Sequence, residues 1–213
     1  MRFLLLALLG PLAATPTPGP KASSDAKALL SRTAALYADG AAHAASFGQV
    51  YKPAGFTSAR RESGTLWIQA PQRLRFEYAA PEKKTFTYDA GEGRLFAPED
   101  RQLTVRRLSA EERARLPIVF LSDPAELSRQ YEIALQGSQA SGGLVVLTPR
   151  AARPDLAWLK LSIRGDGSVE ALSYADSGGS LSEFRFEGWR REKARPDSDY
   201  RIAGPPGTRV LEN

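Results

Sequence analysis

The chain of 213 residues contains no cysteine and a single histidine, His43. The missing cysteines exclude structural disulfides, thiolate nucleophiles, cysteine-ligated metals and a lipid anchor on an N-terminal cysteine of this chain. One histidine, expected in an Ala-rich helix, leaves a catalytic triad or a histidine-based metal site almost nothing to build on. No G-x-S-x-G segment and no phosphate-binding lysine loop occurs. We therefore expect that the protein is not an enzyme, holds no metal and uses no cofactor.

An apolar run long enough to cross a bilayer is also missing from the N-terminal region. The run from Phe3 to Ala14 follows Arg2 and has 12 residues, whereas a transmembrane helix needs about 20. A positive charge, a short apolar run and small residues at its end are typical of a cleavable signal peptide, with an uncleaved anchor as the alternative. We expect a signal peptide over residues 1–14, a flexible linker over 15–23 and one domain over 24–213.

The charge of the chain does not indicate a nucleic-acid partner. The formal net charge is +5, but the basic residues are scattered among Asp and Glu, and no Lys/Arg block exceeds two in a row. No nucleic-acid-binding motif is present. A basic surface of this kind suits anionic lipid headgroups or an acidic partner, and a generally solvated surface is the simpler reading.

Short alternating segments joined by turn residues dominate the chain after an Ala-rich helical segment, Ser24–Phe47. The stretch GTLWIQAPQRLRFEY, residues 64–78, reads as two strands that meet at a proline. The loops RGDGS and DSGGS favour tight hairpins, so Arg164-Gly165-Asp166 reads as a turn and not as a cell-adhesion tripeptide. These patterns predict about ten strands in a mainly antiparallel sheet, which must curl because of its size. The middle segment SAEERARLPIVFLSDPAELSRQ predicts two short helices.

The residues alone leave open what the apolar face of this sheet covers. On that face, Leu74, Phe76 and Tyr78 alternate with charged residues along one strand. They could belong to a packed core, or they could line a cavity suited to an acyl chain, in which each buried methylene gains roughly 0.8 kcal/mol.

Five segments, in order, resemble the LolA family of periplasmic outer-membrane lipoprotein carrier proteins. GTLWIQAPQRLRFEY is similar to the family segment G-x-L-W-[apolar]-x-x-P-x-x-[apolar]-x-[aromatic]. PIVFLSD stands where the family has its apolar lid helix. LVVLTPRA, LKLSIRGDGSVEALSYAD and YRIAGPPGTRVLEN resemble a later strand, a hairpin and the C-terminal ending of the family. The resemblance runs from about Ser24 to Leu211, which is nearly the whole expected domain.

The resemblance implies a mainly β fold: an incomplete antiparallel β-barrel of about ten to eleven strands, with short helices forming a lid over the concave apolar face. It implies a periplasmic monomer that receives acylated lipoproteins from an inner-membrane ABC transporter and passes them to an outer-membrane receptor. It assigns Leu66, Ile68, Leu74 and Phe76 to the acyl-binding cavity. We expect the same cavity to include Tyr78, Phe86 and Tyr88, which strand alternation places on apolar faces. The residues that it assigns to the lid are Ile118, Val119, Phe120 and Leu121.

One position departs from the family pattern. Typical members carry an arginine directly before the proline of the first segment, where it holds the closed lid, and this chain has Ala70 there. The resemblance therefore implies a lid held by Arg73 or by no specific residue. It also leaves an alternative function, that of a related half-barrel protein that binds another lipid or senses envelope stress.

Overall fold

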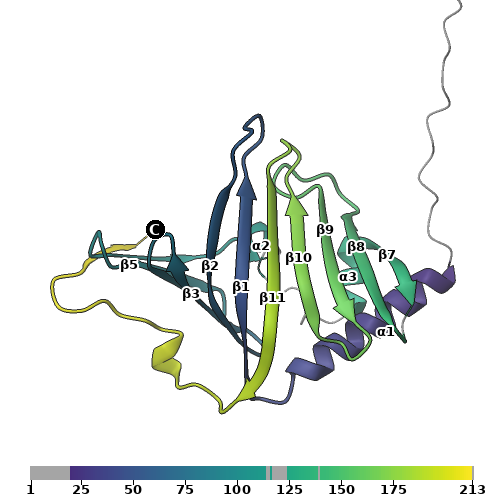
Figure 1. The fold of residues 1–213 in the computed structure, drawn as a ribbon, viewed down its shortest axis with the longest axis horizontal. Coiled ribbons are helices and arrows are strands. Elements are labelled where there is room, and N and C mark those ends of the chain that lie inside the picture. Colours follow the sequence, from purple (N-terminus) through teal and green to yellow (C-terminus); the bar gives the residue numbers. More distant parts are fainter. Residues whose placement is uncertain (1–19, 114–115, 117–123, 139, 213) are drawn as a thin grey trace, which may run out of the picture.

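The computed structural model describes residues 20–113, 116, 124–138 and 140–212, and their architecture is mainly β (Figure 1). Twelve strands form one open sheet in the order β12-β6-β5-β4-β3-β2-β1-β11-β10-β9-β8-β7. The first six are β1 Ala42–Lys52, β2 Arg60–Gln69, β3 Arg73–Ala80, β4 Lys84–Asp89, β5 Glu92–Ala97 and β6 Gln102–Arg107. The others are β7 Tyr131–Ser138, β8 Gly142–Pro149, β9 Trp158–Arg164, β10 Val169–Ala175, β11 Leu181–Glu192 and β12 Arg209–Glu212. The helices are α1 Pro20–Tyr37, α2 Ala110–Arg113 and α3 Pro124–Gln130, with a 3-10 turn, η2, at Asp197–Asp199.

The predicted antiparallel half-barrel is confirmed, and the sheet is larger than expected. It has twelve strands in place of ten to eleven, and its edge strand β12 pairs with β6 in parallel. The parallel pair arises because the chain leaves β11, crosses the sheet and reaches its far edge running in the direction of β6. The sheet curls: Figure 1 shows β1, β11 and β10 face-on and β3 and β5 close to edge-on.

The prediction of a helix through Phe47 is wrong beyond Tyr37, and His43 lies in β1. Gly40, at φ 75°, turns the chain out of the helix. The Asp39 side chain supports this turn by accepting a hydrogen bond from the Ala41 N–H at 3.0 Å. Although alanine favours helices, β1 lies between β2 and β11, where backbone pairing decides its conformation.

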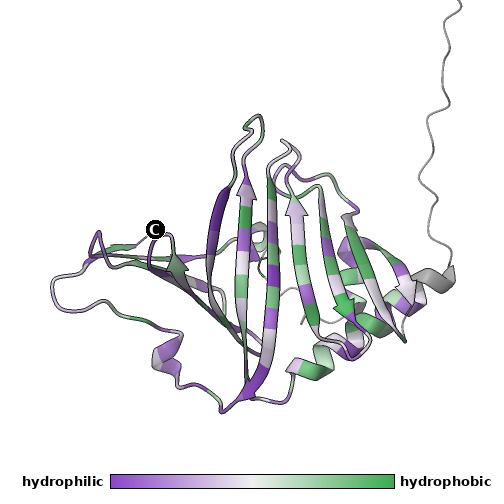
Figure 2. Ribbon diagram, viewed as in Figure 1, coloured by the Kyte–Doolittle hydropathy of each residue, from purple (hydrophilic) through white to green (hydrophobic). Residues whose placement is uncertain are grey.

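Helix α1 packs against β7 and α3 through one apolar side. Its Leu29 and Leu30 are fully buried, in the same apolar cluster as residues of β8 and β9. Polar and aromatic contacts tie the rest of the helix to the sheet. The Arg32 Nη1 donates to the Gly165 carbonyl at 2.6 Å, and the Tyr37 ring meets Trp189 edge-on at 5.2 Å. Figure 2 shows the apolar bands of α1 beside the lower ends of the strands.

The segment from Lys193 to Gly207, here called the strap, lies before β12 in the chain. It crosses the face of the sheet opposite to the one that carries Leu74 and Phe76, and this face is called the outer face. Tyr200 anchors it, because this side chain is 1% exposed and its hydroxyl donates to Gln69 Oε1 at 3.2 Å. Burial raises the pKa of Tyr200 to about 12, so its phenol stays protonated as a donor. Further along, Arg75 and Arg94 reach from the sheet and donate to strap carbonyls. Directional polar contacts thus hold the strap over β2 to β5.

A buried carboxylate links the strap to the sheet. Asp89, in β4, accepts from Arg73 Nε at 3.1 Å and from Arg201 Nε at 2.7 Å, and its side chain is 8% exposed. Burial alone would raise the pKa of Asp89, but the hydrogen bonds from Arg201 and Arg73 outweigh it and hold the pKa below its ordinary value. The charged form of Asp89 therefore stabilises the folded protein.

We predict that Leu30→Ala lowers the free energy of unfolding by about 3 kcal/mol, because Leu30 is fully buried and the cavity left behind cannot collapse completely. Urea unfolding followed by circular dichroism measures the loss. Leu36→Ala is the matched control, since Leu36 in the same helix is 39% exposed, and its effect should stay below about 0.5 kcal/mol. Equal losses for the two variants would contradict the packing of α1 described above.

We predict that Asp89→Asn costs about 1–3 kcal/mol at neutral pH, because charge-assisted hydrogen bonds to two arginines are weakened. A carboxylate with a lowered pKa stabilises the fold above its ordinary pKa, near 3.9, and this contribution is lost as the pH falls. The difference in unfolding free energy between wild type and variant should therefore shrink between about pH 5 and pH 2.

Asp197→Asn provides the matched control for that experiment. Asp197 also pairs with Arg73, at 2.8 Å, but its side chain is 66% exposed, so its removal should cost under about 1 kcal/mol. A gap between Asp89→Asn and wild type that stayed constant down to low pH would show that the Asp89 charge is not what stabilises the strap.

Candidate functional site

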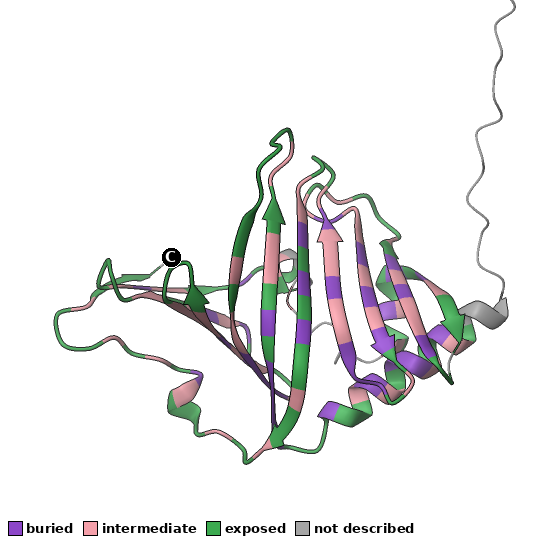
Figure 3. Ribbon diagram, in the orientation of Figure 1, coloured by how far each residue is buried: buried purple, intermediate pink, exposed green. Residues whose placement is uncertain are grey.

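The inner face of the sheet is the face that carries Leu66, Leu74 and Phe76, and the strap lies on the opposite, outer face. Strand pairing places Leu66 opposite Phe76 and Ile68 opposite Leu74. On the next strand, Phe86 stands opposite Phe76, and Tyr88 opposite Leu74. Since side chains alternate between faces along a strand, one apolar row runs across β2, β3 and β4. Figure 3 shows the same alternation of buried and exposed positions along β1 and β11.

The row continues into β1 and β11 as a cluster of aromatic rings. The centroid of Phe47 lies 5.0 Å from that of Phe76 and 5.1 Å from that of Tyr78, both edge-on. Phe184 lies 5.9 Å from Phe76 and stacks on Phe186 at 6.2 Å. Edge-to-face and offset pairs of this kind are favourable beyond the area that they bury. The cluster joins the middle of the sheet into one continuous apolar surface.

All seven residues expected to line a cavity come together on this inner face. Leu66, Ile68, Leu74, Phe76 and Tyr88 belong to the apolar core cluster and are at most 4% exposed, while Tyr78 and Phe86 are half-buried and pack against it. Their part in ligand binding stays a prediction. Sequence reasoning missed Phe47, Phe184 and Phe186. The alternation in LSEFRFEGW could have revealed the last two, but Phe47 was assigned to a helix.

Tyr78 closes the aromatic cluster on the side of the β3–β4 turn. Its hydroxyl donates to Gln49 Oε1 at 3.0 Å, and the Lys84 Nζ lies 4.4 Å from its ring centroid. Burial raises the pKa of Tyr78 well above its ordinary value, and the nearby Glu62 carboxylate adds to the shift. The phenol is therefore neutral at any physiological pH, which keeps this end of the inner face uncharged apart from the paired Lys84 and Glu62.

The expected lid residues Ile118, Val119, Phe120 and Leu121 lie outside the described residues. The segments on both sides of them contact the inner face. Before them, Ser109 and Glu112 form a capping box that starts α2, and Leu116 packs against the core cluster. After them, Leu127 in α3 is 2% exposed within the same cluster.

Ala70 stands half-buried at the turn between β2 and β3. Arg73, the residue that could have replaced the missing arginine, does not face the inner side. Its guanidinium lies over the Tyr200 ring at 5.5 Å and pairs with Asp89 and Asp197 on the outer face. Arg73 therefore holds the strap. The alternative that it also holds the lid stays a prediction, since the lid residues lie outside the described residues.

His43 also has a structural role. Its Nε2 lies 2.9 Å from Asp39 Oδ1, and its ring meets Tyr37 edge-on at 5.0 Å. Hydrogen bonds from Arg191 and His43 hold the pKa of Asp39 well below its ordinary value. These contacts join the end of α1 to β1 and β11. In the part of the chain that the structure describes, no group of three or more His, Asp or Glu side chains is arranged to hold a metal ion.

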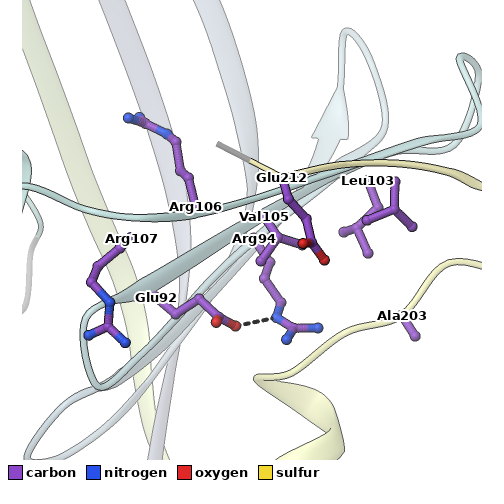
Figure 4. A pocket seen from close by; sticks show the side chains of 9 residues that line it. Glu92, Arg94, Leu103, Val105, Arg106, Arg107, Ala203 and Glu212 are labelled. Atoms are coloured by element: carbon purple, nitrogen blue, oxygen red, sulfur yellow. Dashed lines mark hydrogen bonds and ion pairs between the residues drawn. The ribbon is translucent and has the colours of Figure 1, made fainter.

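A separate pocket of about 460 Å³ opens on the outer face between the strap and the edge of the sheet. Glu92 and Arg94 from β5 form an ion pair at 2.7 Å inside it (Figure 4). Its other lining residues are Leu103, Val105, Arg106, Arg107, Ala203, Val210 and Glu212. The lining mixes both signs of charge with apolar side chains, so no one ligand chemistry is favoured there.

The family model described as outer membrane lipoprotein carrier protein LolA matches residues 41–203. This chain belongs to the LolA family. The match extends from the start of β1 through most of the strap, so it includes both the inner face and the strap.

Relatives in the LolA family align with most of this chain at low sequence identity. The outer-membrane lipoprotein carrier protein of Xanthomonas campestris pv. campestris (strain B100) is 28% identical over 167 residues, which cover 78% of this chain and 79% of the relative. That of Pseudomonas fluorescens (strain Pf0-1) is 26% identical over 171 residues, which cover 79% and 81%. The alignments thus cover most of this chain and most of each relative.

Solved structures with a similar fold are more distant in sequence. An uncharacterized conserved protein from Thermus thermophilus aligns with a TM-score of 0.56 at 12% identity, covering 87% of this chain and 97% of the other. MucB aligns with a TM-score of 0.53 at 17% identity, covering 88% and 66%. These likenesses concern the fold alone. Among the described residues of this LolA-family chain, no helix is long and apolar enough to cross a membrane.

Proposed function

We propose that this protein is a periplasmic carrier that binds the acyl chains of lipoproteins on its inner face and shuttles them from the inner to the outer membrane. Family membership and the carrier names of the relatives support the class of function. The single structural feature that supports it best is the apolar row on the inner face, which runs without a break from β8 to β4. Such a surface can lie along several methylene chains at once.

The burial of the inner face sets the mechanism of loading. Leu66, Ile68 and Leu74 are fully buried within the protein's own structure, so acyl chains reach them only when a covering segment moves. The lid segment Ile118–Leu121 is the proposed cover, because Leu116 before it and Leu127 after it pack on the inner face. Cargo then binds by replacing one apolar contact with another, and the two states compete directly.

This competition keeps the affinity low enough for release. Each methylene buried gains roughly 0.8 kcal/mol, but the displaced apolar side chains lose a comparable burial when they leave the inner face. Only the difference between the two terms remains as affinity. We propose that an inner-membrane ABC transporter supplies the cargo and that an outer-membrane receptor with a permanently open site accepts it.

The protein in this proposal is a monomer and acts without a cofactor or a chemical step. We propose that residues 1–14 are the signal peptide that directs it to the periplasm and that a linker joins it to the carrier domain, residues 24–213. Helix α1 begins at Pro20, within the span 15–23 expected for that linker. The likeness to MucB is one of fold at 17% identity, so it does not favour the alternative of a stress-sensing protein over a carrier.

We predict that Phe86→Glu together with Leu95→Glu weakens the binding of a triacylated lipopeptide roughly tenfold or more, because a carboxylate beside acyl chains loses its hydration. Phe86 and Leu95 stand opposite each other on the inner face. Phe86 is half-buried and Leu95 is 40% exposed, so both substitutions are compatible with folding. Phe76, at 3% exposure, is a poorer position, because a buried charge there would unfold the protein. Fluorescence titration with a dansyl-labelled lipopeptide measures the affinity.

Val210→Glu is the matched control for the inner-face variant. Val210 is 51% exposed, lies on β12 and lines the pocket of the outer face, so the same change of chemistry there should leave lipopeptide binding within about twofold of wild type. If the double variant also binds as wild type does, then acyl chains do not contact this part of the inner face.

The carrier function itself is tested by release. Purified protein added to spheroplasts that are synthesising lipoproteins should bring lipoproteins into the soluble fraction as a complex that co-elutes with it. A protein that releases no lipoprotein and retains no acylated peptide is not a lipoprotein carrier.

A further inference from the structure

The hairpin formed by β1 and β2 ends in an exposed aromatic tip. Phe56, in the loop between the two strands, is 63% exposed, and Tyr51 at the end of β1 is 37% exposed. In Figure 1 this hairpin forms the uppermost point of the sheet. Burying the exposed Phe56 ring would gain about 2 kcal/mol, so this ring favours contact with an apolar environment.

The same tip is basic. The sequence YKPAGFTSARR, residues 51–61, contains Lys52, Arg60 and Arg61 and no acidic residue. All three basic side chains are exposed, and none of the ion pairs found among the described residues involves them. Glu62, the first acidic residue beyond the tip, is already paired with Lys84. The tip therefore carries three exposed cations that form no ion pair among the described residues.

The backbone holds Phe56 in its outward position. The Phe56 N–H donates to the Pro53 carbonyl at 3.2 Å, and Gly55 has φ 75° at the third position of this turn. The Ala54 N–H also donates to Ser180 Oγ at 3.4 Å, which ties the tip to the loop between β10 and β11. The tip is therefore an ordered protrusion, so presenting its ring to a ligand costs little conformational entropy.

We propose that this hairpin tip, formed by Tyr51–Arg61, docks on the surface of an anionic lipid bilayer. In the docked state, the Phe56 ring enters the boundary between headgroups and acyl chains, while Lys52, Arg60 and Arg61 pair with lipid phosphates. Aromatic rings are favoured at that boundary, and each basic residue near an anionic surface adds roughly fivefold to binding. Charge complementarity and one protruding ring together select a lipid surface.

An acidic protein partner fits this tip less well. A stable protein interface buries on the order of 1,000 Å² or more over a matched surface, whereas the tip is a narrow hairpin end with two exposed aromatic rings, Phe56 and Tyr51. A bilayer needs no matched shape, because lipids rearrange around an inserted side chain. The proposal goes beyond the carrier function: it concerns a surface away from the inner-face row, and cargo-free protein should show it.

Cosedimentation of cargo-free protein with vesicles tests the proposal. Vesicles of phosphatidylglycerol and phosphatidylcholine in equal amounts should bind the protein at least tenfold more tightly than vesicles of phosphatidylcholine alone. Phe56→Ser should weaken that binding about fivefold or more, and Lys52→Ser with Arg60→Ser should weaken it roughly twentyfold. Thermal unfolding of both variants should match wild type, because all three side chains are exposed.

Arg185→Ser with Lys193→Ser is the matched control, since both side chains are exposed, lie outside the tip and carry the same total charge. This variant should bind anionic vesicles within about twofold of wild type. Binding that falls equally in the two charge variants would show adsorption by net charge alone and would overturn the proposal. The same holds if Phe56→Ser has no effect.

Two further results separate this proposal from its alternatives. A wild-type protein that binds polyglutamate but not anionic vesicles would overturn lipid docking in favour of an acidic polypeptide partner. Lipopeptide binding in detergent-free solution should be unchanged in Phe56→Ser, so loss of vesicle binding with intact cargo binding supports the docking tip. Failure of cargo binding in wild type would instead count against the proposed carrier function and leave the vesicle result to stand by itself.

Discussion

The constraint on which the structure depends is the continuous apolar row on one side of a curled sheet. Strand pairing sets Leu66 against Phe76 and Phe76 against Phe86, and the same row continues through Phe47 and Phe184. A face of this size cannot stay in water, because every strand adds apolar area at a cost of about 25 cal/mol per Å². Helix α1, Leu116 and Leu127 are placed where they are because they help to cover it.

The two faces of the sheet are covered by different kinds of contact. On the outer face, the strap is held by hydrogen bonds and ion pairs such as Arg75 to the Asp199 carbonyl and Asp89 to Arg201. These contacts are directional, and a different molecule could not reproduce them. On the inner face the contacts are apolar and depend on area more than on geometry. An acyl chain can replace them, which is why the proposed exchange of cover for cargo belongs to the inner face.

The match to the LolA family includes both the inner face and most of the strap, although the relatives share low sequence identity with this chain. Relatives at 26–28% identity match along nearly four fifths of the chain. The position before the proline, Ala70, has no side chain that could reach a lid, and Arg73 is committed to Tyr200 and Asp89 on the outer face. If the cover moves as proposed, its resting position depends on apolar packing, with Leu127 as the buried contact nearest to it in sequence.

The resemblance of five segments indicated the family. The sequence alone was enough to predict the mainly β class and most strand positions, because period-two alternation and turn residues are local signals. It also placed Leu66, Leu74 and Phe76 on one face. The tertiary structure was needed to establish that Ala42–Phe47 is strand and not helix, since its pairing with β2 and β11 outweighs alanine's local preference. It also decided the parallel pairing of β12 and the outward role of Arg73. Both depend on the path of the strap, which is set by contacts between residues more than 100 positions apart, and local sequence patterns carry no signal for such contacts.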